Sequence, residues 1–122
     1  RKAAEQGSAT AQFAIGCMHL RGFGAAMDFP QALKWWGKAA DQRHARAMFF
    51  LGKAHLFGLG VLQDFVYSYA WFNLSAYHGD ADASPYREKL AKKMTPEQIA
   101  KAQELSKELL KKIEANKKAE KK

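Results

Sequence analysis

The sequence contains a single cysteine, Cys17, and no apolar run long enough to cross a bilayer. One cysteine cannot form an intrachain disulfide framework, and a membrane-spanning helix needs about 20 consecutive apolar residues. The chain must therefore fold around an apolar core, and hydrophobic residues make up 48% of its 122 residues. That content excludes a disordered chain. We expect one compact domain without a membrane span.

Acidic residues are scarce in the last part of the chain. Residues 1–86 contain 8 Lys/Arg and 6 Asp/Glu, whereas residues 87–122 contain 12 and 6, so most of the net charge of +8 lies at the C-terminal end. An evenly basic fold would favour nucleic acid or anionic lipid as a partner. The observed distribution predicts a solvated, Lys-rich final helix instead. Nucleic acid is not an expected partner, although contact of this tail with nucleic acid or an anionic surface stays open.

An internal repeat is present at an offset of 36 residues. Residues 11–46 and 47–82 match at twelve positions, where ordinary composition gives roughly two or three. A period of this length predicts a solenoid of stacked helical units. We therefore divide the chain into the end of a truncated repeat (1–10), two repeats (11–46 and 47–82), C-terminal capping helices (83–115) and a Lys-rich tail (116–122). Because Arg1–Gly7 has the pattern of a last helical turn with its glycine cap, we expect a piece of a longer protein.

Each unit is predicted to contain two helices. The first covers about residues 10–21 and 46–57, and Gly16 and Gly52 occupy equivalent interior positions in it. Glycine costs about 1 kcal/mol of helix propensity relative to alanine, so its recurrence predicts a close helix crossing that a Cβ would hold apart. Helical spacing assigns to the core the first-helix residues Ala11, Ile15, Met18 and His19.

The second helix of each unit is predicted to start after an aspartate. Asp28 and Asp64 are suited to cap it, Pro30 fits its first turn, and Gln31 completes a capping box with Asp28. Its large side chains are expected in the core; they are Trp35, Trp36, Trp71 and Phe72.

The repeat ends after Ala83. A short helix is predicted from Tyr86 to Lys93, and Thr95–Gln98 is a helix start with a capping box. An apolar stripe follows at spacings of three and four, which is typical of a helix that closes a solenoid. Its members are Ile99, Ala102, Leu105, Leu109 and Ile113. The tail is expected to fray from about Asn116.

Motifs of catalysis or metal binding are absent. Gly22-Phe23-Gly24 and Gly58-Leu59-Gly60 follow helices rather than strands and lack a third glycine, so we interpret them as turns and not as phosphate-binding loops. His19 and His55 are equivalent, but neighbouring helices lie roughly 8–10 Å apart, too far to share a metal with bonds of about 2 Å. We expect half-buried histidines, no enzyme, no cofactor, no metal and no small-molecule substrate.

These residues resemble the Sel-one-like repeat family, which is related to the tetratricopeptide repeat. The resemblance rests on the segment 11–16, the Gly-x-Gly loops, Asp28-Phe29 with Asp64-Phe65, and the segment 32–40. The segment 80–100 resembles the C-terminal cap of bacterial members. The sequence departs from the family at His19 and His55, usually Tyr, and at Arg43, usually Gly. The resemblance implies an α/α superhelix that serves as a scaffold or adaptor in signalling, envelope or host-interaction complexes. The compartment stays open between the bacterial periplasm and cytoplasm.

In such repeats the first helix of each unit lines the concave surface, which predicts the binding residues. The face opposite the core carries Thr10, Phe13, Cys17, Leu20 and Arg21 in one unit, and Arg46, Phe49, Lys53, Leu56 and Phe57 in the next. As protein-binding residues we select Arg21, Arg46, Phe49, Lys53 and Phe57, with Phe13 and Phe49 partly shared with the core. Cations beside an aromatic anchor suit a peptide with acidic and apolar residues.

Two alternatives stay open. Phe57 can fold under the loop at Gly58–Gly60, which would leave only a solvated groove. The chain can also be a structural module that associates through the amphipathic helix around 99–113. We expect a monomer that binds a protein or peptide.

Overall fold

The computed structural model describes residues 8–21 and 27–120, without the side chains of Arg21 and of 117–120. The predicted turn at Arg1–Gly7 and the loop Gly22-Phe23-Gly24 lie outside this part. The described residues form six helices and no strand, so the all-α prediction is confirmed. The helices are α2 (Ala9–Arg21), α3 (Phe29–Asp41), α4 (Ala45–Phe57), α5 (Phe65–Tyr77), α6 (Ala83–Ala91) and α7 (Pro96–Glu120).

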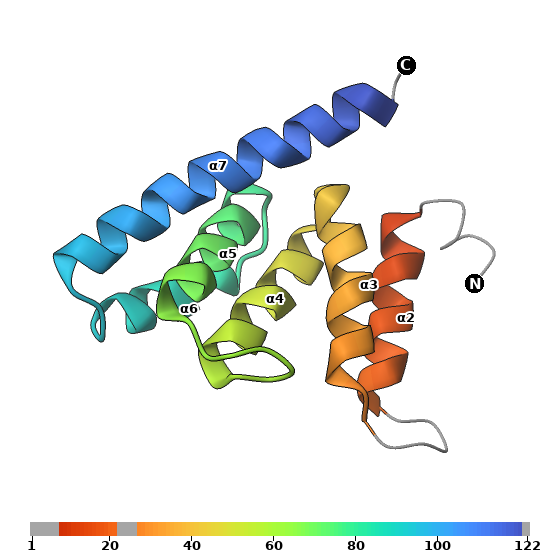
Figure 1. Ribbon diagram of the computed structural model, residues 1–122, viewed down its shortest axis with the longest axis horizontal. Coiled ribbons are helices and arrows are strands. Elements are labelled where there is room, and N and C mark those ends of the chain that lie inside the picture. The colour runs from red at the N-terminus through yellow and green to blue at the C-terminus, as the bar shows by residue number, and fades with distance from the viewer. Residues whose placement is uncertain (1–7, 22–26, 121–122) are drawn as a thin grey trace.

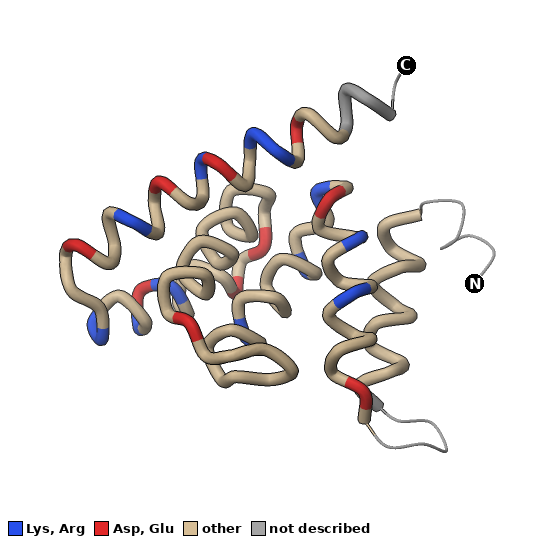
Figure 2. Tube along the Cα trace, viewed as in Figure 1, with Lys and Arg blue, Asp and Glu red and all other residues tan. Residues whose placement is uncertain are grey.

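The helices stack as successive hairpins (Figure 1). Helix α2 packs against α3, and α4 packs against α5, while contacts between α3 and α4 join the two units. The long helix α7 packs along α5 and also reaches α3. The charged residues of the described chain are concentrated on α6 and α7, whereas α2 and α3 carry few (Figure 2). The predicted solenoid is therefore confirmed.

The second helices begin at the predicted aspartates. The Oδ1 atom of Asp28 accepts a hydrogen bond from the N–H of Gln31 at 3.1 Å, and that of Asp64 accepts one from the N–H of Tyr67 at 3.1 Å. Each carboxylate satisfies one of the unpaired N–H groups of a first helical turn.

The capping box predicted at Gln31 is wrong. The N–H of Asp28, which the Gln31 side chain would bind, donates to the carbonyl of His19 at 3.0 Å, and the Gln31 side chain is exposed. In the second unit the N–H of Asp64 donates to the carbonyl of His55 at 2.9 Å. This repeated bond ties the end of the loop back to the first helix.

Gly16 and Gly52 lie at close helix crossings, as predicted. A Cβ at Gly16 would stand 2.5 Å from Cδ1 and Nε1 of Trp36. A Cβ at Gly52 would stand 2.6 Å from Cδ1 and Cε1 of Phe72. Because Trp36 and Phe72 are themselves equivalent at the offset of 36, each unit uses one glycine to receive one large aromatic side chain.

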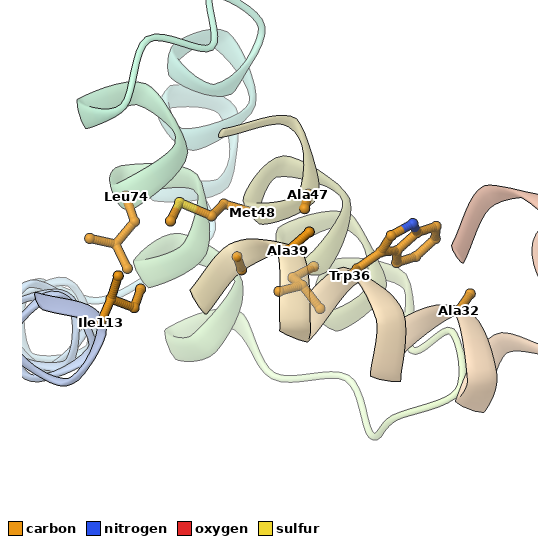
Figure 3. Close-up of a cluster of buried hydrophobic side chains, with 9 residues drawn as sticks. Ala32, Trp36, Ala39, Ala47, Met48, Leu74 and Ile113 are labelled. Atoms are coloured by element: carbon orange, nitrogen blue, oxygen red, sulfur yellow. The ribbon is translucent and has the colours of Figure 1, made fainter. Parts of the chain in front are cut away.

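The core is continuous from α3 to α7. Trp36 from α3, Met48 from α4, Leu74 from α5 and Ile113 from α7 belong to one buried cluster (Figure 3). Trp71 packs against this cluster while partly exposed. The other large side chains of the second helices, Trp36 and Phe72, are buried as predicted.

Two core assignments are wrong. Trp35 is half-buried and, unlike Trp71, packs against neither buried cluster; the Nζ atom of Lys38 lies 4.5 Å from its ring centroid. Ile15 is buried as predicted, but Met18 is 52% exposed. Instead, residues that were predicted on the opposite face of α2 pack against the buried cluster; they are Phe13, Cys17 and Leu20. Most residues of α2 are apolar or small, so the spacing of apolar residues alone does not determine which face of the helix is buried.

The C-terminal helices differ in detail from the prediction. Helix α6 begins at Ala83, earlier than Tyr86, and α7 continues to Glu120, past the predicted fraying point at Asn116. Along the predicted stripe, Ala102 and Ile113 are buried, and the other three residues are half-buried. The capping box is complete: the Oγ1 atom of Thr95 accepts from the N–H of Gln98 at 3.1 Å, and Oε1 of Gln98 accepts from the N–H of Thr95 at 2.9 Å.

Arg43 adopts a left-handed backbone conformation, with φ of 66°, in the turn between α3 and α4. Its equivalent one unit later is Gly79, with φ of 104°. A side chain in this region costs about 1–2 kcal/mol, which explains why the resembling family prefers glycine at position 43. The Arg43 side chain forms an ion pair with Glu114 of α7, with an N–O distance of 3.6 Å.

We expect Arg43→Gly to raise the free energy of unfolding by about 0.5 kcal/mol. Relief of the left-handed strain exceeds the entropy cost of glycine and the loss of a solvent-screened ion pair. Gly79→Ala is the matched control and should lower the free energy by about 1 kcal/mol, since no atom lies within 4 Å of its Cβ and only the backbone is strained. Urea unfolding measures both changes. The same sign for both variants would contradict the explanation.

Candidate protein-binding surface

The first helices of successive units are linked by aromatic side chains. Phe13 of α2 meets Phe50 of α4 edge to face, with ring centroids 5.2 Å apart. Phe49 of α4 meets Tyr86 of α6 in the same way, at 5.0 Å. Phe49 lies 36 residues after Phe13, and Tyr86 lies 36 residues after Phe50. The same contact is therefore made in two successive units. We call Phe13, Phe50, Phe49 and Tyr86 the aromatic row.

Helix α6 occupies the place of a first helix in a third unit. Ala83 and Leu90 are buried at the positions that correspond to the buried Ala47 and Ala54 of α4. The contact of Tyr86 with Phe49 follows the same register. The surface built by α2 and α4 therefore continues onto α6.

Two cations lie over the aromatic row. The guanidinium carbon of Arg46 is 4.6 Å from the ring centroid of Phe49 and 5.5 Å from that of Phe50. The Nζ atom of Lys53 is 5.4 Å from each of these two centroids and 5.8 Å from that of Tyr86. Cations within about 6 Å of a ring centroid are attracted by the negative face of the ring.

Arg46 is already engaged within the chain. Its Nη1 atom lies 3.2 Å from Oδ2 of Asp80 and 2.8 Å from Oδ2 of Asp82. Burial alone would lower the pKa of Arg46, but the hydrogen bonds that it donates to Asp82 and Asp80, together with their negative charges, outweigh burial and raise that pKa above its usual value. Arg46, which the sequence analysis selects as a binding residue, thus holds the start of α4 to the turn before α6.

Lys53 differs from Arg46 in having no anionic partner. Among the described residues no carboxylate lies within 4 Å of its Nζ atom. Its ammonium group has three donors, and the rings beneath it accept none of them strongly. Lys53 is therefore the cation of this surface that remains available for an external acid.

Phe57 is 58% exposed, so the alternative in which it folds under the adjacent loop is not observed. It shares one face of α4 with Arg46, Phe50 and Lys53, because the four residues follow spacings of four, three and four. Gly58 and Gly60 form the turn after it with φ of 70° and 75°, as predicted. An exposed aromatic side chain beside an unpaired cation suits a protein contact.

The other predicted binding residues are Phe49 and Arg21. Phe49 is only 2% exposed, so it supports the row from beneath, and its sharing with the core is larger than predicted. The side chain of Arg21 lies outside the described part of the chain. The sequence reasoning missed Phe50 and Tyr86. Phe50 follows from its helical spacing to Lys53, and Tyr86 follows from Phe50 at the offset of 36.

His44 borders the aromatic row at the start of α4. Its ring stacks on that of Phe13 with centroids 4.8 Å apart, and its Nδ1 atom accepts a hydrogen bond from the N–H of Ala47 at 3.1 Å. Only a neutral ring can accept this bond. Burial lowers the pKa of His44 below its usual 6.5.

His55 is half-buried, as predicted, and its ring stacks on that of Tyr67 at 5.2 Å. Burial lowers the pKa of His55 too. The negative charge of Asp64 and a hydrogen bond with the Leu62 backbone raise that pKa, but by less.

We expect the melting temperature to fall as the pH is lowered from about 7.5 to about 5.5. The unfolded chain protonates both histidines near pH 6.5, whereas the folded chain does so only at lower pH. The neutral rings therefore make their full contribution to stability at a pH above the pKa of the unfolded chain. This contribution is lost as the pH falls toward the lowered pKa values of the folded chain. His44→Asn keeps a capping acceptor that does not titrate, so it should flatten the dependence. A melting temperature that stays constant over this range would show that the rings titrate normally.

A cleft of about 450 Å³ lies away from this surface, between α5 and α7. Asn73 and Ser106 are among its polar lining residues, and the Nδ2 atom of Asn73 donates a hydrogen bond to Oγ of Ser106 at 3.2 Å. Arg87 donates to Oδ1 of Asn73 at 2.9 Å. The bond to Ser106 joins α5 to α7, and the bond from Arg87 joins α6 to α5.

The described residues contain no group of three or more His, Cys, Asp or Glu side chains placed to hold a metal ion. None of the helices in this part of the chain has the length and apolar character that crossing a membrane requires.

Comparison with known proteins places the repeats. The family model described as Sel1 repeat matches residues 9–44 and 45–80, two residues ahead of the units defined above by self-comparison. No curated protein matches the chain.

Two solved structures are similar to the chain. One is a protective antigen of uropathogenic Escherichia coli strains that displays an SLR fold, with a TM-score of 0.86 and 36% identity over 93% of this chain. The other is a Sel1 repeat protein from Oxalobacter formigenes, with a TM-score of 0.66 and 37% identity over 70% of this chain. The chain spans 24% and 35% of the lengths of these two proteins.

Proposed function

Because the chain belongs to the Sel1 repeat family, whose repeats form protein-interaction scaffolds, we propose that it binds a protein or peptide partner through the aromatic row and the adjoining face of α4, without catalysing a reaction. The observation that carries this proposal is the position of Lys53. Its ammonium group lies over three rings, has no carboxylate within 4 Å among the described residues, and shares a helix face with the exposed Phe57.

The contact residues divide into anchors and supports. Phe57 and the half-buried rings of Phe50 and Tyr86 supply apolar area, and Lys53 supplies charge. Phe49 and Arg46 hold these groups in place. A surface of this kind suits a segment with an apolar side chain for Phe57 and an acidic one for Lys53, since aromatic anchors dominate affinity and charges guide association.

Burial of the α7 stripe favours this function over assembly through the C-terminal helix. Ala102 and Ile113 are buried within the same chain, against α5 and its neighbours. A partner helix would have to displace these contacts before it could use the stripe. The face of α4 requires no such rearrangement.

We expect Phe57→Ala and Lys53→Glu each to weaken partner binding by about tenfold. The partner is first captured on the immobilised chain and identified, and its affinity for each purified variant is then titrated. Tyr77→Ala and Lys111→Glu are matched controls, because they change an exposed aromatic residue and an exposed lysine outside this surface. Thermal melts verify folding. Unchanged affinity of both test variants would show that the partner binds elsewhere.

A further inference from the structure

We propose that Arg46 is a second acid-binding group of the protein-binding surface, and that Asp82 occupies it in the free chain until a carboxylate of the partner takes its place. This inference rests on the proposed function, because it concerns the same surface. It goes further in naming an internal competitor for the partner and the residue that this competitor blocks.

The two aspartates that bind Arg46 are held in different ways. The side chain of Asp80 is 7% exposed, and its Oδ1 atom also accepts a hydrogen bond from the backbone N–H of Asp82 at 2.9 Å. The side chain of Asp82 is 64% exposed and makes no capping hydrogen bond to α6, although it stands directly before that helix. Asp80 is therefore fixed in the turn, whereas the carboxylate of Asp82 can leave Arg46 without breaking a backbone contact.

Arg46 has more hydrogen-bond donors than the two aspartates use. All of its bonds to them come from Nη1, at 3.2 Å to each carboxylate oxygen of Asp80 and at 2.8 Å to Oδ2 of Asp82. Nη1 has two hydrogens for these three oxygens, while Nε and Nη2 carry the other three donors of the guanidinium. Because the side chain of Arg46 is 41% exposed, a partner carboxylate can reach the guanidinium while Asp80 stays bound.

The charges around Arg46 explain why a partner acid has to replace an internal one. Arg46 and Lys53 are the two cations over the ring of Phe49, at 4.6 Å and 5.4 Å from its centroid. Asp80 and Asp82 bring two negative charges to the same place. These four charges sum to zero, so a further acid gains little net attraction as long as Asp82 remains on Arg46.

Release of Asp82 costs little, because of its position before α6. The first N–H groups of a helix favour a nearby carboxylate, so the charge of Asp82 stays favourable at the start of α6 after it leaves Arg46. Arg46 keeps its bonds to Asp80, and with them the link between α4 and the turn.

Asp82 lies on the surface that the partner uses in the proposed function. It is the equivalent of Arg46 at the offset of 36, and α6 continues the surface of α4. Arg46 and Lys53 are seven residues apart on α4, which places their backbone positions about 10 Å apart along the helix. A partner with one acid on Lys53 can therefore place a second acid on Arg46. Competition with Asp82 makes this second contact a source of selectivity for acidic partners.

The test titrates two peptides into isotope-labelled protein and follows them by NMR. One peptide consists of leucine, serine and glutamate, and the other has glutamine in place of each glutamate. The acidic peptide should shift the carboxyl carbon signal of Asp82 more than that of Asp80, because only Asp82 loses its contact with the guanidinium. The glutamine peptide should leave both signals in place.

Substitutions test the competition independently. Asp82→Asn should tighten binding of the acidic peptide by about threefold and leave that of the glutamine peptide unchanged, since it removes the competing charge. Arg46→Gln should abolish this gain in the double variant, and thermal melts verify folding. Glu97→Gln is the matched control, because it removes an exposed carboxylate of α7 outside this surface and should change neither affinity.

Several results would overturn the inference. An Asp82 signal that stays in place at saturation with the acidic peptide would show that Asp82 remains on Arg46. Equal tightening by Asp82→Asn and Glu97→Gln would assign the effect to the net charge of the chain. If the acidic peptide does not bind while Phe57→Ala still impairs capture of the partner, the inference fails and the proposed function stands. An oligothymidine that shifts the Asp82 signal where the acidic peptide does not would assign Arg46 to nucleic acid instead.

Discussion

Replacing Gly52 by leucine should lower the free energy of unfolding by about 3 kcal/mol. A Cβ at this position would lie 2.6 Å from two ring atoms of Phe72, closer than any van der Waals contact. The ring cannot withdraw easily, because Phe49 and Tyr86 lie 5.7 Å and 5.5 Å from its centroid. The leucine side chain would therefore have to push α4 and α5 apart.

Gly37 provides the matched control. It also lies inside a helix, but no atom is found within 4 Å of the position of its Cβ. Gly37→Leu should raise the free energy of unfolding by up to about 1 kcal/mol through helix propensity alone. Urea unfolding of both variants separates the steric effect from the propensity effect. A raised melting temperature for Gly52→Leu would show that the crossing has room for a side chain.

Ile113→Asp should lower the free energy of unfolding by about 4 kcal/mol. Ile113 is almost fully buried, in the cluster that contains Met48 of α4 and Leu74 of α5. A carboxylate there would lose its hydration without gaining a partner. Hydrogen exchange should show the second half of α7 released from α5, and urea unfolding measures the loss of stability.

Ala115→Asp is the control for this prediction. Ala115 lies two residues later on the exposed side of α7, so the same carboxylate should change stability by under about 0.5 kcal/mol. If Ile113→Asp were equally harmless, the end of α7 would not be part of the core. Association through that helix would then become the stronger candidate function.

The sequence predicts those features that depend on local spacing or on the repeat. The period of 36 residues, the caps at Asp28 and Asp64, and the crossings at Gly16 and Gly52 all follow from residues a few positions apart or one unit apart. Such features are decided by backbone geometry and by contacts that recur in every unit. They need no knowledge of the remaining fold.

Features that depend on the rotation of a helix about its own axis, or on partners far away in the sequence, were not predicted. Met18 was placed in the core because α2 has apolar or small residues on several faces, and only the position of α3 decides which of them is buried. Arg46 was predicted to be available, yet Asp80 and Asp82, which bind it, lie in the turn before α6. Their proximity arises only when the second and third units stack.

Helix α7 determines how stiff the molecule is. An array of helical hairpins changes its curvature by small rotations between neighbouring units. Because α7 contacts both α5 and α3, such a rotation would require it to slide along one of them. The orientation of the first unit relative to the second is therefore set before a partner arrives, and the entropy lost on binding falls mainly on the partner segment.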